Sequence, residues 1–388
     1  MDLRFTPEQE RFRQEVREFI QSNMTPELQE EIEHGEPLGP HGRQMYKKLC
    51  ARGWVGMGWP KEYGGQAADL TDQFIFEEEA SRFAVYVGDL TVAGMGPVIM
   101  QVGSEEQKRH FLPGILRGDT IFAIGYTEPS GGSDLASLQT RAVQDGDDYV
   151  INGQKMFTTE AHVASHVWLL ARTDPEQRKH RGLSIFLIPM NTPGIAVRPL
   201  WGIGGGRTNE VFLDNVRVPK TWMLGESNMG WYVAAMALNL ERSGAARYVR
   251  YVRPYESLLQ FVREARYDGY SLAEDPAVRQ MMAELAIDIR VARLLAYRSF
   301  SLVKSGNVNP AYEHSAFKTW GSELSQRIAG VGLKVMGMYG QLEPGSRWAP
   351  LKGMFERLYQ RTVPNTIGHG TSQINRNVIA TRGLGLPR

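Results

Sequence analysis

Apolar residues near the N-terminus recur at the spacing of an α-helix. Four of them share one face of such a helix: Phe12, Val16, Phe19 and Ile20. Ahead of them stand Thr6, a Pro and Gln9, which supply a capping hydroxyl, a first helical residue and the partner of a capping box. Helical spacing broken by Pro and Gly continues to about residue 119. We therefore expect an N-terminal helical domain over residues 1–120.

The spacing then changes to that of β-strands. Five short segments are rich in β-branched and aromatic residues and are bounded by turn residues. They are residues 122–124, 149–151, 166–172, 183–188 and 210–213. Short strands separated by turns predict a mostly antiparallel β domain over residues 121–228.

Helical spacing returns after residue 229. Six apolar residues follow alternating steps of four and three: Val278, Met282, Leu285, Ile289, Ala292 and Ala296. Such a stripe is typical of an amphipathic helix in a bundle. The predicted fold class is thus α+β, with an N-terminal helical domain, a middle antiparallel β domain and a C-terminal four-helix bundle over residues 229–388.

Composition and charge exclude several classes of protein. Among the 388 residues, 44 Lys and Arg balance 43 Asp and Glu, so the net charge of +1 gives no signature of nucleic-acid binding. Cys50 is the only cysteine, which excludes an intramolecular disulfide and fits a reducing compartment. The charged start of the chain does not resemble a secretory signal, and no apolar run is long enough for a membrane span. We expect a cytoplasmic protein.

The segment from Phe122 to Asp134 carries the first candidate chemistry. An apolar strand breaks into a loop in which Gly131 and Gly132 let backbone N–H groups approach a phosphate. Ser133 adds a hydroxyl donor. Taken alone, this is equally well an ordinary Gly/Ser loop.

A second segment, residues 149–159, follows closely. We expect Asn152-Gly153 to form a hairpin turn that returns the chain into Phe157 and Thr159. Phe157 offers an apolar face for stacking, and Thr127 of the preceding loop can bond a polar ring edge. Together the two segments predict one end of a site for a flat heterocycle that carries a pyrophosphate.

These motifs resemble those of the acyl-CoA dehydrogenases, flavoproteins that oxidise the Cα–Cβ bond of an acyl thioester. Matching motifs occur in the family's order along essentially the whole chain: residues 58–65, 103–108, 111–119, 127–129, 132–134, 152–155, 240–242 and 370–373. The resemblance implies that FAD is lodged between the β domain and the C-terminal bundle.

The resemblance also implies roles for individual residues. Six in the β domain match contacts to the flavin, its pyrophosphate or the nearby thioester: Tyr126, Thr127, Gly132, Ser133, Phe157 and Thr159. Phe157 stands where the family often has Trp, a conservative change for stacking. Thr371 and Gln373 match positions that bind the adenosine half, at a helix start that favours anionic phosphate. Ser133, Arg242 and His369 are the residues expected to meet the substrate.

The catalytic base departs from the family's usual pattern. Most members carry Glu where this chain has His369, directly before Gly370. A second family solution places the base directly before an Arg on the first long C-terminal helix, and here Glu241 precedes Arg242. We assign Glu241 as the base and keep His369 as the competing base, because a neutral imidazole can accept a proton at physiological pH. The backbone N–H of His369 matches the family's donor to the thioester carbonyl.

Two clamps that the family donates across a dimer are altered. The Arg-x-x-Phe-Gly motif appears as residues 265–269, where Arg266 could reach the pyrophosphate and Asp268 replaces the aromatic. The Gln-x-x-Gly-Gly motif appears as residues 334–338, with Lys334 and Gly337 at its key positions. This imbalance resembles the heteromeric members that oxidise steroid side-chain CoA esters, in which a partner chain completes the site.

The leading hypothesis is an FAD-dependent acyl-CoA dehydrogenase that acts on an acyl-CoA and passes electrons to an electron-transfer flavoprotein. It would assemble as a homo- or heterotetramer, a dimer of dimers. The alternatives are a flavin oxidase or monooxygenase on the same fold, or a partner subunit with a degraded site. His162 and His166 lack an evident third ligand, so no metal is predicted.

Overall fold

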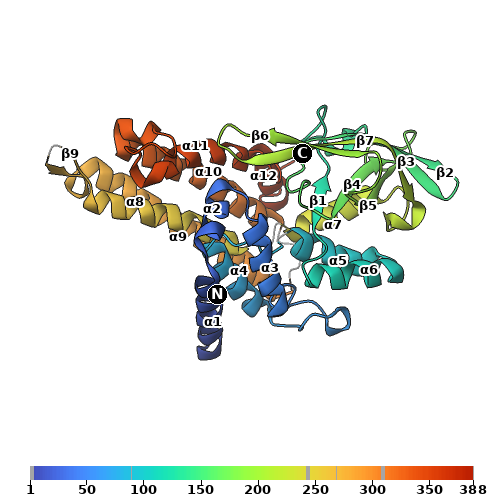
Figure 1. The fold of residues 1–388 in the computed structure, drawn as a ribbon, viewed down its shortest axis with the longest axis horizontal. Helices are drawn as coiled ribbons and strands as arrows, with labels where there is room; N and C mark the ends of the chain where they lie inside the picture. The colour runs from blue at the N-terminus through green and yellow to red at the C-terminus, as the bar shows by residue number, and fades with distance from the viewer. Residues whose placement is uncertain (1–3, 89, 242–244, 268, 307–310, 388) are drawn as a thin grey trace.

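The computed structural model describes residues 4–88, 90–241, 245–267, 269–306 and 311–387. Its outline is elongated, with the large sheet at one end, a pair of long helices reaching to the other, and the N-terminal helices between them (Figure 1). The order of helices, sheet and helices matches the predicted fold class.

The N-terminal region is helical, as predicted. Its helices are α1 (Pro7–Asn23), α2 (Pro26–His34), α3 (Pro40–Ala51), α4 (Leu70–Arg82), α5 (Gly96–Val102) and α6 (Glu105–Leu116). Thr6 caps α1 and forms the predicted capping box with Gln9. Val16 and Ile20 are fully buried, while Phe12 and Phe19 pack against the same core. The local sequence therefore sets both the start of α1 and its buried face.

An eight-stranded sheet forms the middle of the chain. Its strands are β1 (Phe122–Gly125), β2 (Arg141–Asp145), β3 (Asp148–Lys155), β4 (His166–Arg172), β5 (Leu183–Pro189), β6 (Ile195–Trp201), β7 (Arg207–Pro219) and β8 (Met223–Leu224). The spatial order is β6-β7-β3-β2-β4-β5-β8, and β1 pairs with β4. Only the β1–β4 and β2–β4 pairings are parallel among these described strands, so the mostly antiparallel prediction is confirmed.

The predicted Asn152-Gly153 turn is wrong. Both residues lie inside β3, and the chain reverses instead at Gly146, between β2 and β3. The pairing of β3 with β7 shifts register between Ile151 and Gly153, which marks a bulge. Gly153 is needed there because a Cβ would lie 2.5 Å from the Thr140 hydroxyl oxygen. An Asn-Gly pair thus serves a bulge in a long strand rather than a hairpin turn.

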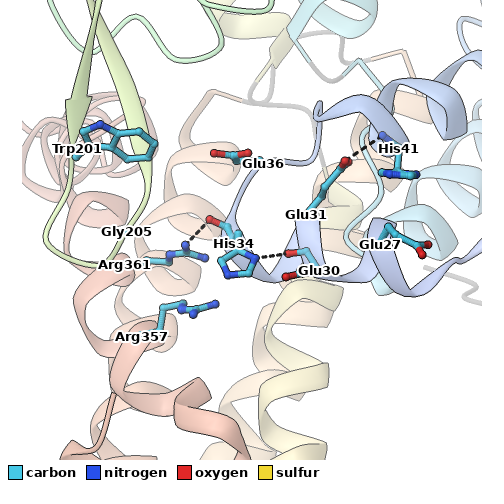
Figure 2. Close-up of a pocket in the computed structure, with 10 residues that line it drawn as sticks. All are labelled: Glu27, Glu30, Glu31, His34, Glu36, His41, Trp201, Gly205, Arg357 and Arg361. Atoms are coloured by element: carbon cyan, nitrogen blue, oxygen red, sulfur yellow. Dashed lines mark hydrogen bonds between the residues drawn. The ribbon is translucent and has the colours of Figure 1, made fainter. Parts of the chain in front are cut away.

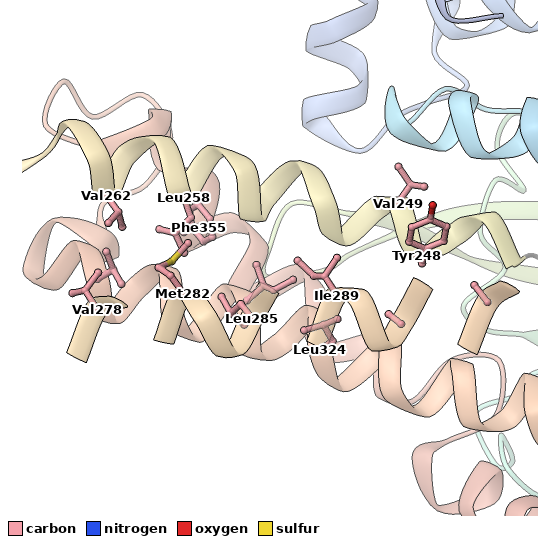
Figure 3. Packing of buried hydrophobic residues seen from close by; sticks show 14 of the residues in the cluster. Tyr248, Val249, Leu258, Val262, Val278, Met282, Leu285, Ile289, Leu324 and Phe355 are labelled. Atoms are coloured by element: carbon pink, nitrogen blue, oxygen red, sulfur yellow. The ribbon is translucent and has the colours of Figure 1, made fainter. Parts of the chain in front are cut away.

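The C-terminal region is again helical. Its elements are α7 (Gly230–Glu241), a 3₁₀ segment (Ala245–Tyr251), α8 (Val252–Glu264), the short strands β9 (Arg266–Tyr267) and β10 (Tyr270–Ser271), α9 (Pro276–Lys304), α10 (Ala311–Met336), α11 (Met354–Thr362) and α12 (Ser372–Val378). All six apolar residues predicted to form a stripe are buried on α9. Figure 3 shows four of them, Val278, Met282, Leu285 and Ile289, among side chains of α8, α10 and α11.

Two apolar cores join the regions. Val233, Ala234 and Ala237 of α7 share a cluster with Trp168 of β4 and with residues of α5, α6 and β5. Phe74 of α4 belongs to the core of the C-terminal helices. Helix α7 therefore leads from the face of the sheet toward the helical region. No helix in the described ranges is long and apolar enough to cross a membrane.

Candidate functional site

The structure brings the two predicted segments of the β domain side by side. The backbone N–H of Met156, just after β3, donates to the Thr127 carbonyl at 2.8 Å. Glu128 and Gly131 exchange two backbone hydrogen bonds, of 3.0 and 3.1 Å, which close the loop after β1 into a tight turn. The loop and the turn that carries Phe157 thus form one surface.

A buried ion pair fixes this arrangement. Lys155 is fully buried, and its Nζ lies 2.8 Å from Oε1 of the buried Glu128. The same carboxylate accepts hydrogen bonds from the backbone N–H groups of Gln139 and Thr140 and from the Thr140 hydroxyl. Both charged residues lie within motifs that match the family, but the sequence predicted no role for either of them. The signal available was a charged residue at the end of an apolar strand, which needs a partner when buried.

The electrostatics of this pair follow from its burial. Loss of hydration disfavours the ammonium form and lowers the pKa of Lys155 to about 8, although the Glu128 charge acts in the opposite direction. Burial also works against ionisation of Glu128, yet the Lys155 charge and the hydrogen bonds outweigh it and lower the pKa of this carboxyl. The carboxylate is therefore a permanent anchor for the loop rather than a proton donor or acceptor.

The face of the loop is open. Ser133 is exposed, and a Cβ placed on Gly132 would meet only Thr127 Cγ2, at 3.8 Å. Neither Gly131 nor Gly132 has a positive φ, so the backbone conformation does not require glycine at either position, although a Cβ on Gly131 would lie 3.1 Å from Ser137 Oγ. The small residues leave room for a ligand to approach the backbone, which fits a pyrophosphate.

Phe157 is the most unusual residue of this surface. Its φ is +54°, in the left-handed region that bulky residues avoid, and its side chain is 58 % exposed. An exposed aromatic ring gains no burial that would compensate the strained backbone. Residues held in this way cluster at ligand sites. The ring face is available for stacking on a flat heterocycle, so Phe157 and the open loop fit a flavin.

Tyr126 and Thr159 lie on either side of this surface in different states. The Tyr126 ring is buried in the core, and its hydroxyl accepts a hydrogen bond from Trp168 Nε1 at 2.9 Å. Thr159 is exposed, with its hydroxyl 3.3 Å from that of Thr208 on β7. A contact from Tyr126 to a cofactor would therefore use its backbone.

A second group of predicted residues lies around the start of α12. Thr371 caps this helix by accepting the Ile374 N–H at 3.1 Å, and Gln373 is exposed. His369 is exposed with a φ of +57°, and the following Gly370 carbonyl accepts a hydrogen bond from Lys318 of α10 at 2.7 Å. Helix α10 thus holds the turn that presents the imidazole.

A third group lies at the far end of the helical region. Arg266 is in the β9–β10 hairpin, and Lys334 and Gly337 are at the C-terminal end of α10. The Tyr267 hydroxyl lies 3.3 Å from the Met336 carbonyl and brings the two motifs together. Figure 1 shows β9 at the opposite end of the molecule from β1 to β5. These residues do not meet Phe157 within one chain.

Glu241 and Arg242 are the remaining predicted site residues. Glu241 ends α7, whose apolar side packs on β4 and β5, but its side chain lies outside the described residues. Arg242 lies outside them altogether. Their roles remain predictions.

A cavity of about 520 Å³ lies elsewhere, between α2, the β6–β7 hairpin and α11 (Figure 2). Arg361 spans this junction: it donates to the Gly204 carbonyl at 2.7 Å, to the Glu33 carbonyl at 3.0 Å and to the His34 carbonyl at 2.5 Å. The Gly202–Gly206 segment forms the turn of this hairpin, in which the Gly202 N–H donates to the Gly206 carbonyl at 2.8 Å. None of the predicted site residues lines the cavity. The described part of the chain contains no group of three His, Cys, Asp or Glu side chains arranged to hold a metal.

Comparisons with known proteins cover nearly the whole chain. Three family models match in order: the N-terminal domain of acyl-CoA dehydrogenase over residues 6–119, the middle domain over 123–216 and the C-terminal domain over 228–384. The chain belongs to the acyl-CoA dehydrogenase family. It is therefore a flavoprotein-family oxidoreductase that acts on acyl-CoA.

Individual relatives in this family are similar over their whole length. The acyl-CoA dehydrogenase FadE26 of Mycobacterium tuberculosis is 37 % identical, covering 100 % of this chain and 99 % of its own. A solved structure titled Tcur3481-Tcur3483 steroid ACAD superposes with a TM-score of 0.92 at 37 % identity over 100 % of both chains. The ChsE4-ChsE5 complex from Mycobacterium tuberculosis gives a TM-score of 0.91 at 36 % identity, again over 100 % of both chains.

Proposed function

We propose that this chain is an FAD-dependent dehydrogenase that introduces a double bond between Cα and Cβ of an acyl-CoA thioester. The observation that carries the proposal is Phe157, an exposed ring held in a left-handed turn beside the open Gly132 loop. The buried Glu128–Lys155 pair anchors both segments and supports a rigid, prebuilt surface.

The described residues suggest how the cofactor is held. Phe157 and Thr127 receive the flavin ring, while Gly132 and Ser133 receive its phosphates. Thr371 and Gln373 at the start of α12 face the adenosine half. When bound, FAD would supply the acceptor for the hydride that leaves Cβ. The chain contributes binding, orientation and removal of the α proton.

Removal of the α proton is assigned to Glu241 as the base, with His369 as the competing base. The end of α7 and the turn before α12 are the elements that carry these groups. The backbone N–H of His369 would donate to the thioester carbonyl and stabilise the negative charge that develops there.

Exchange of the α proton separates the two bases. Glu241→Gln should retain FAD and lose exchange of the α proton into deuterated water, whereas His369→Ala should retain both. The opposite pattern would assign the base to His369.

One complete site requires two chains. The α10 end with Arg266 and Lys334 lies away from Phe157, and α9 alone, with 29 residues, extends over about 44 Å. We propose a dimer of dimers in which a neighbouring chain brings this end to the flavin. The relatives titled as two-component complexes favour a heterotetramer.

Reconstitution decides between the two assemblies. The purified chain alone should bind less than one FAD per subunit and should fill only with a second subunit. One FAD per chain in an active homotetramer would instead establish a homomeric enzyme.

The proposed substrate is a CoA ester of a steroid side chain, because a relative of known structure is titled a steroid ACAD. Anaerobic bleaching of bound FAD across short, branched and steroid CoA esters tests the function and the substrate together. Reoxidation by an electron-transfer flavoprotein, with little peroxide released in air, would support the dehydrogenase. Rapid oxygen consumption with peroxide would assign an oxidase, and failure of every ester to bleach the flavin would overturn the proposal.

A further inference from the structure

A buried side chain of β7 bonds the turn that presents Phe157. Asn209, the third residue of β7, is fully buried. Its Nδ2 donates to the Thr158 carbonyl at 2.9 Å, and its own carbonyl accepts the Thr158 N–H at 2.9 Å. Asn209 therefore bonds both backbone groups of Thr158, the residue next to Phe157; the Thr158 carbonyl also accepts the Ala161 N–H at 3.3 Å.

The orientation of the Asn209 amide is set by its other neighbours. Arg207 Nε donates to Oδ1 at 3.0 Å, which identifies that atom as the oxygen. Nδ2 lies 3.3 Å from Nδ1 of His162, which must accept because an amide nitrogen only donates. Burial, together with the nearby Arg207 charge, lowers the pKa of His162 and keeps the imidazole in the neutral form that can accept.

Two further contacts connect the same strand to the turn and to the rest of the protein. Thr208 approaches the Thr159 hydroxyl at 3.3 Å. The turn that leads into β7 is anchored by the bond from Arg361 to the Gly204 carbonyl. The start of β7 is thus held from the side of α11 and in turn holds residues 157–159.

We propose that Asn209 is a positioning residue that keeps Phe157 in its left-handed conformation, with the ring face presented to the flavin. This inference rests on the proposed flavin function and extends it to a residue that would not touch the cofactor. A φ of +54° at Phe157 needs support from outside, and no other side chain bonds the described backbone of Thr158.

The sharpest test is Asn209→Asp in the full chain, purified in its native assembly. The change keeps the shape and the acceptor for Arg207, but removes the donor to the Thr158 carbonyl and places two oxygens against each other. We expect the Kd for FAD to rise about 2- to 10-fold, no more than when the Phe157 ring itself is removed. The visible circular dichroism of the flavin, normalised to bound FAD, should change as well.

Asn215→Asp is the matched control. Asn215 is an exposed residue of the same strand, paired with Asn152 away from the turn, so the same substitution there should leave the Kd and the flavin dichroism unchanged. If Asn209→Asp does not fold, Arg207→Met serves instead. It removes the donor that orients the amide, and a smaller change in the same direction is expected.

A double substitution distinguishes positioning from general destabilisation. In a Phe157→Ala background, Asn209→Asp should add little to the loss of FAD affinity, because the residue acts through the ring. Equal effects in both backgrounds, or wild-type dichroism in Asn209→Asp, would overturn the inference while leaving the flavin function intact. A wild-type assembly that binds no FAD would overturn the proposed function itself.

Discussion

The two ends of the proposed flavin site are built in different ways. At the Phe157 end, buried groups fix the surface: Lys155 and Asn209 are both fully buried and hydrogen-bonded. At the far end, Arg266 and Lys334 are exposed on a short hairpin and on a helix end. The first end is prepared before any ligand arrives, whereas in the proposed assembly the second gains its role only when it meets the flavin of a neighbouring chain.

The comparison gives a physical reason for the two altered motifs at the far end. Substituting an exposed residue changes the free energy of unfolding little, so these motifs can change while the protein still folds. At the Phe157 end, replacing either Glu128 or Lys155 would leave the other buried charge without its partner. The following experiments probe this difference, beginning with the largest expected effect.

Removing the buried ammonium should be the most damaging change. Lys155→Met leaves the Glu128 carboxylate buried without its counter-charge and should lower the free energy of unfolding by about 3–5 kcal/mol. Urea unfolding measures this directly. Lys220→Met, which removes the exposed partner of Asp147, is the control and should have no measurable effect. Similar small losses in both variants would show that the anchor is unimportant.

Acid should weaken the same anchor. The Glu128 pKa lies below its ordinary value of 4.5 in the folded protein, so the folded state binds this proton less readily than the unfolded chain does. Its stabilisation is complete above pH 4.5 and is lost as the pH falls through the folded-state value. The difference in unfolding free energy between the wild type and Glu128→Gln should shrink across that window. A difference that stays constant with pH would contradict the assignment.

Relieving the strain at Phe157 should separate stability from binding. Phe157→Asn places a residue that tolerates the left-handed region, so the free energy of unfolding should stay level or rise by up to about 1 kcal/mol. The affinity for FAD should fall about 2- to 10-fold because the stacking face is lost. Thermal unfolding and FAD titration measure the two effects. Val143→Asn, at another exposed apolar residue of the β domain, should leave the FAD affinity unchanged.

The far end should respond least. Arg266→Ala combined with Lys334→Ala should leave the unfolding free energy unchanged, since both side chains are exposed. In the assembled protein the affinity for FAD should fall about 2- to 5-fold, and more at low salt than at high salt. Arg263→Ala, on the nearby end of α8, is the control. An affinity that is insensitive at every salt concentration would remove this end from the proposed site.

The sequence alone predicted the parts of the fold that depend on neighbours along the chain. The cap of α1 and the buried stripe of α9 involve residues three or four positions apart, so the spacing of residue types is sufficient. The motifs of the Gly132 loop and of residues 152–155 also identified the correct family, because their order along the chain is itself informative.

What the sequence could not supply are contacts between distant positions. The Asn152-Gly153 pair has the composition of a turn, and only the pairing of β3 with β7 makes it a bulge. Glu128 meets Lys155 across 27 positions, and Asn209 meets Thr158 across 51. The sequence by itself determined the helical and strand regions, five of the eight strands of the large sheet, and the chemical groups available to a flavin; β2, β6 and β8 were not predicted. The tertiary structure alone decided which charges are buried together and why Phe157 stands exposed, because burial depends on the register of the sheet.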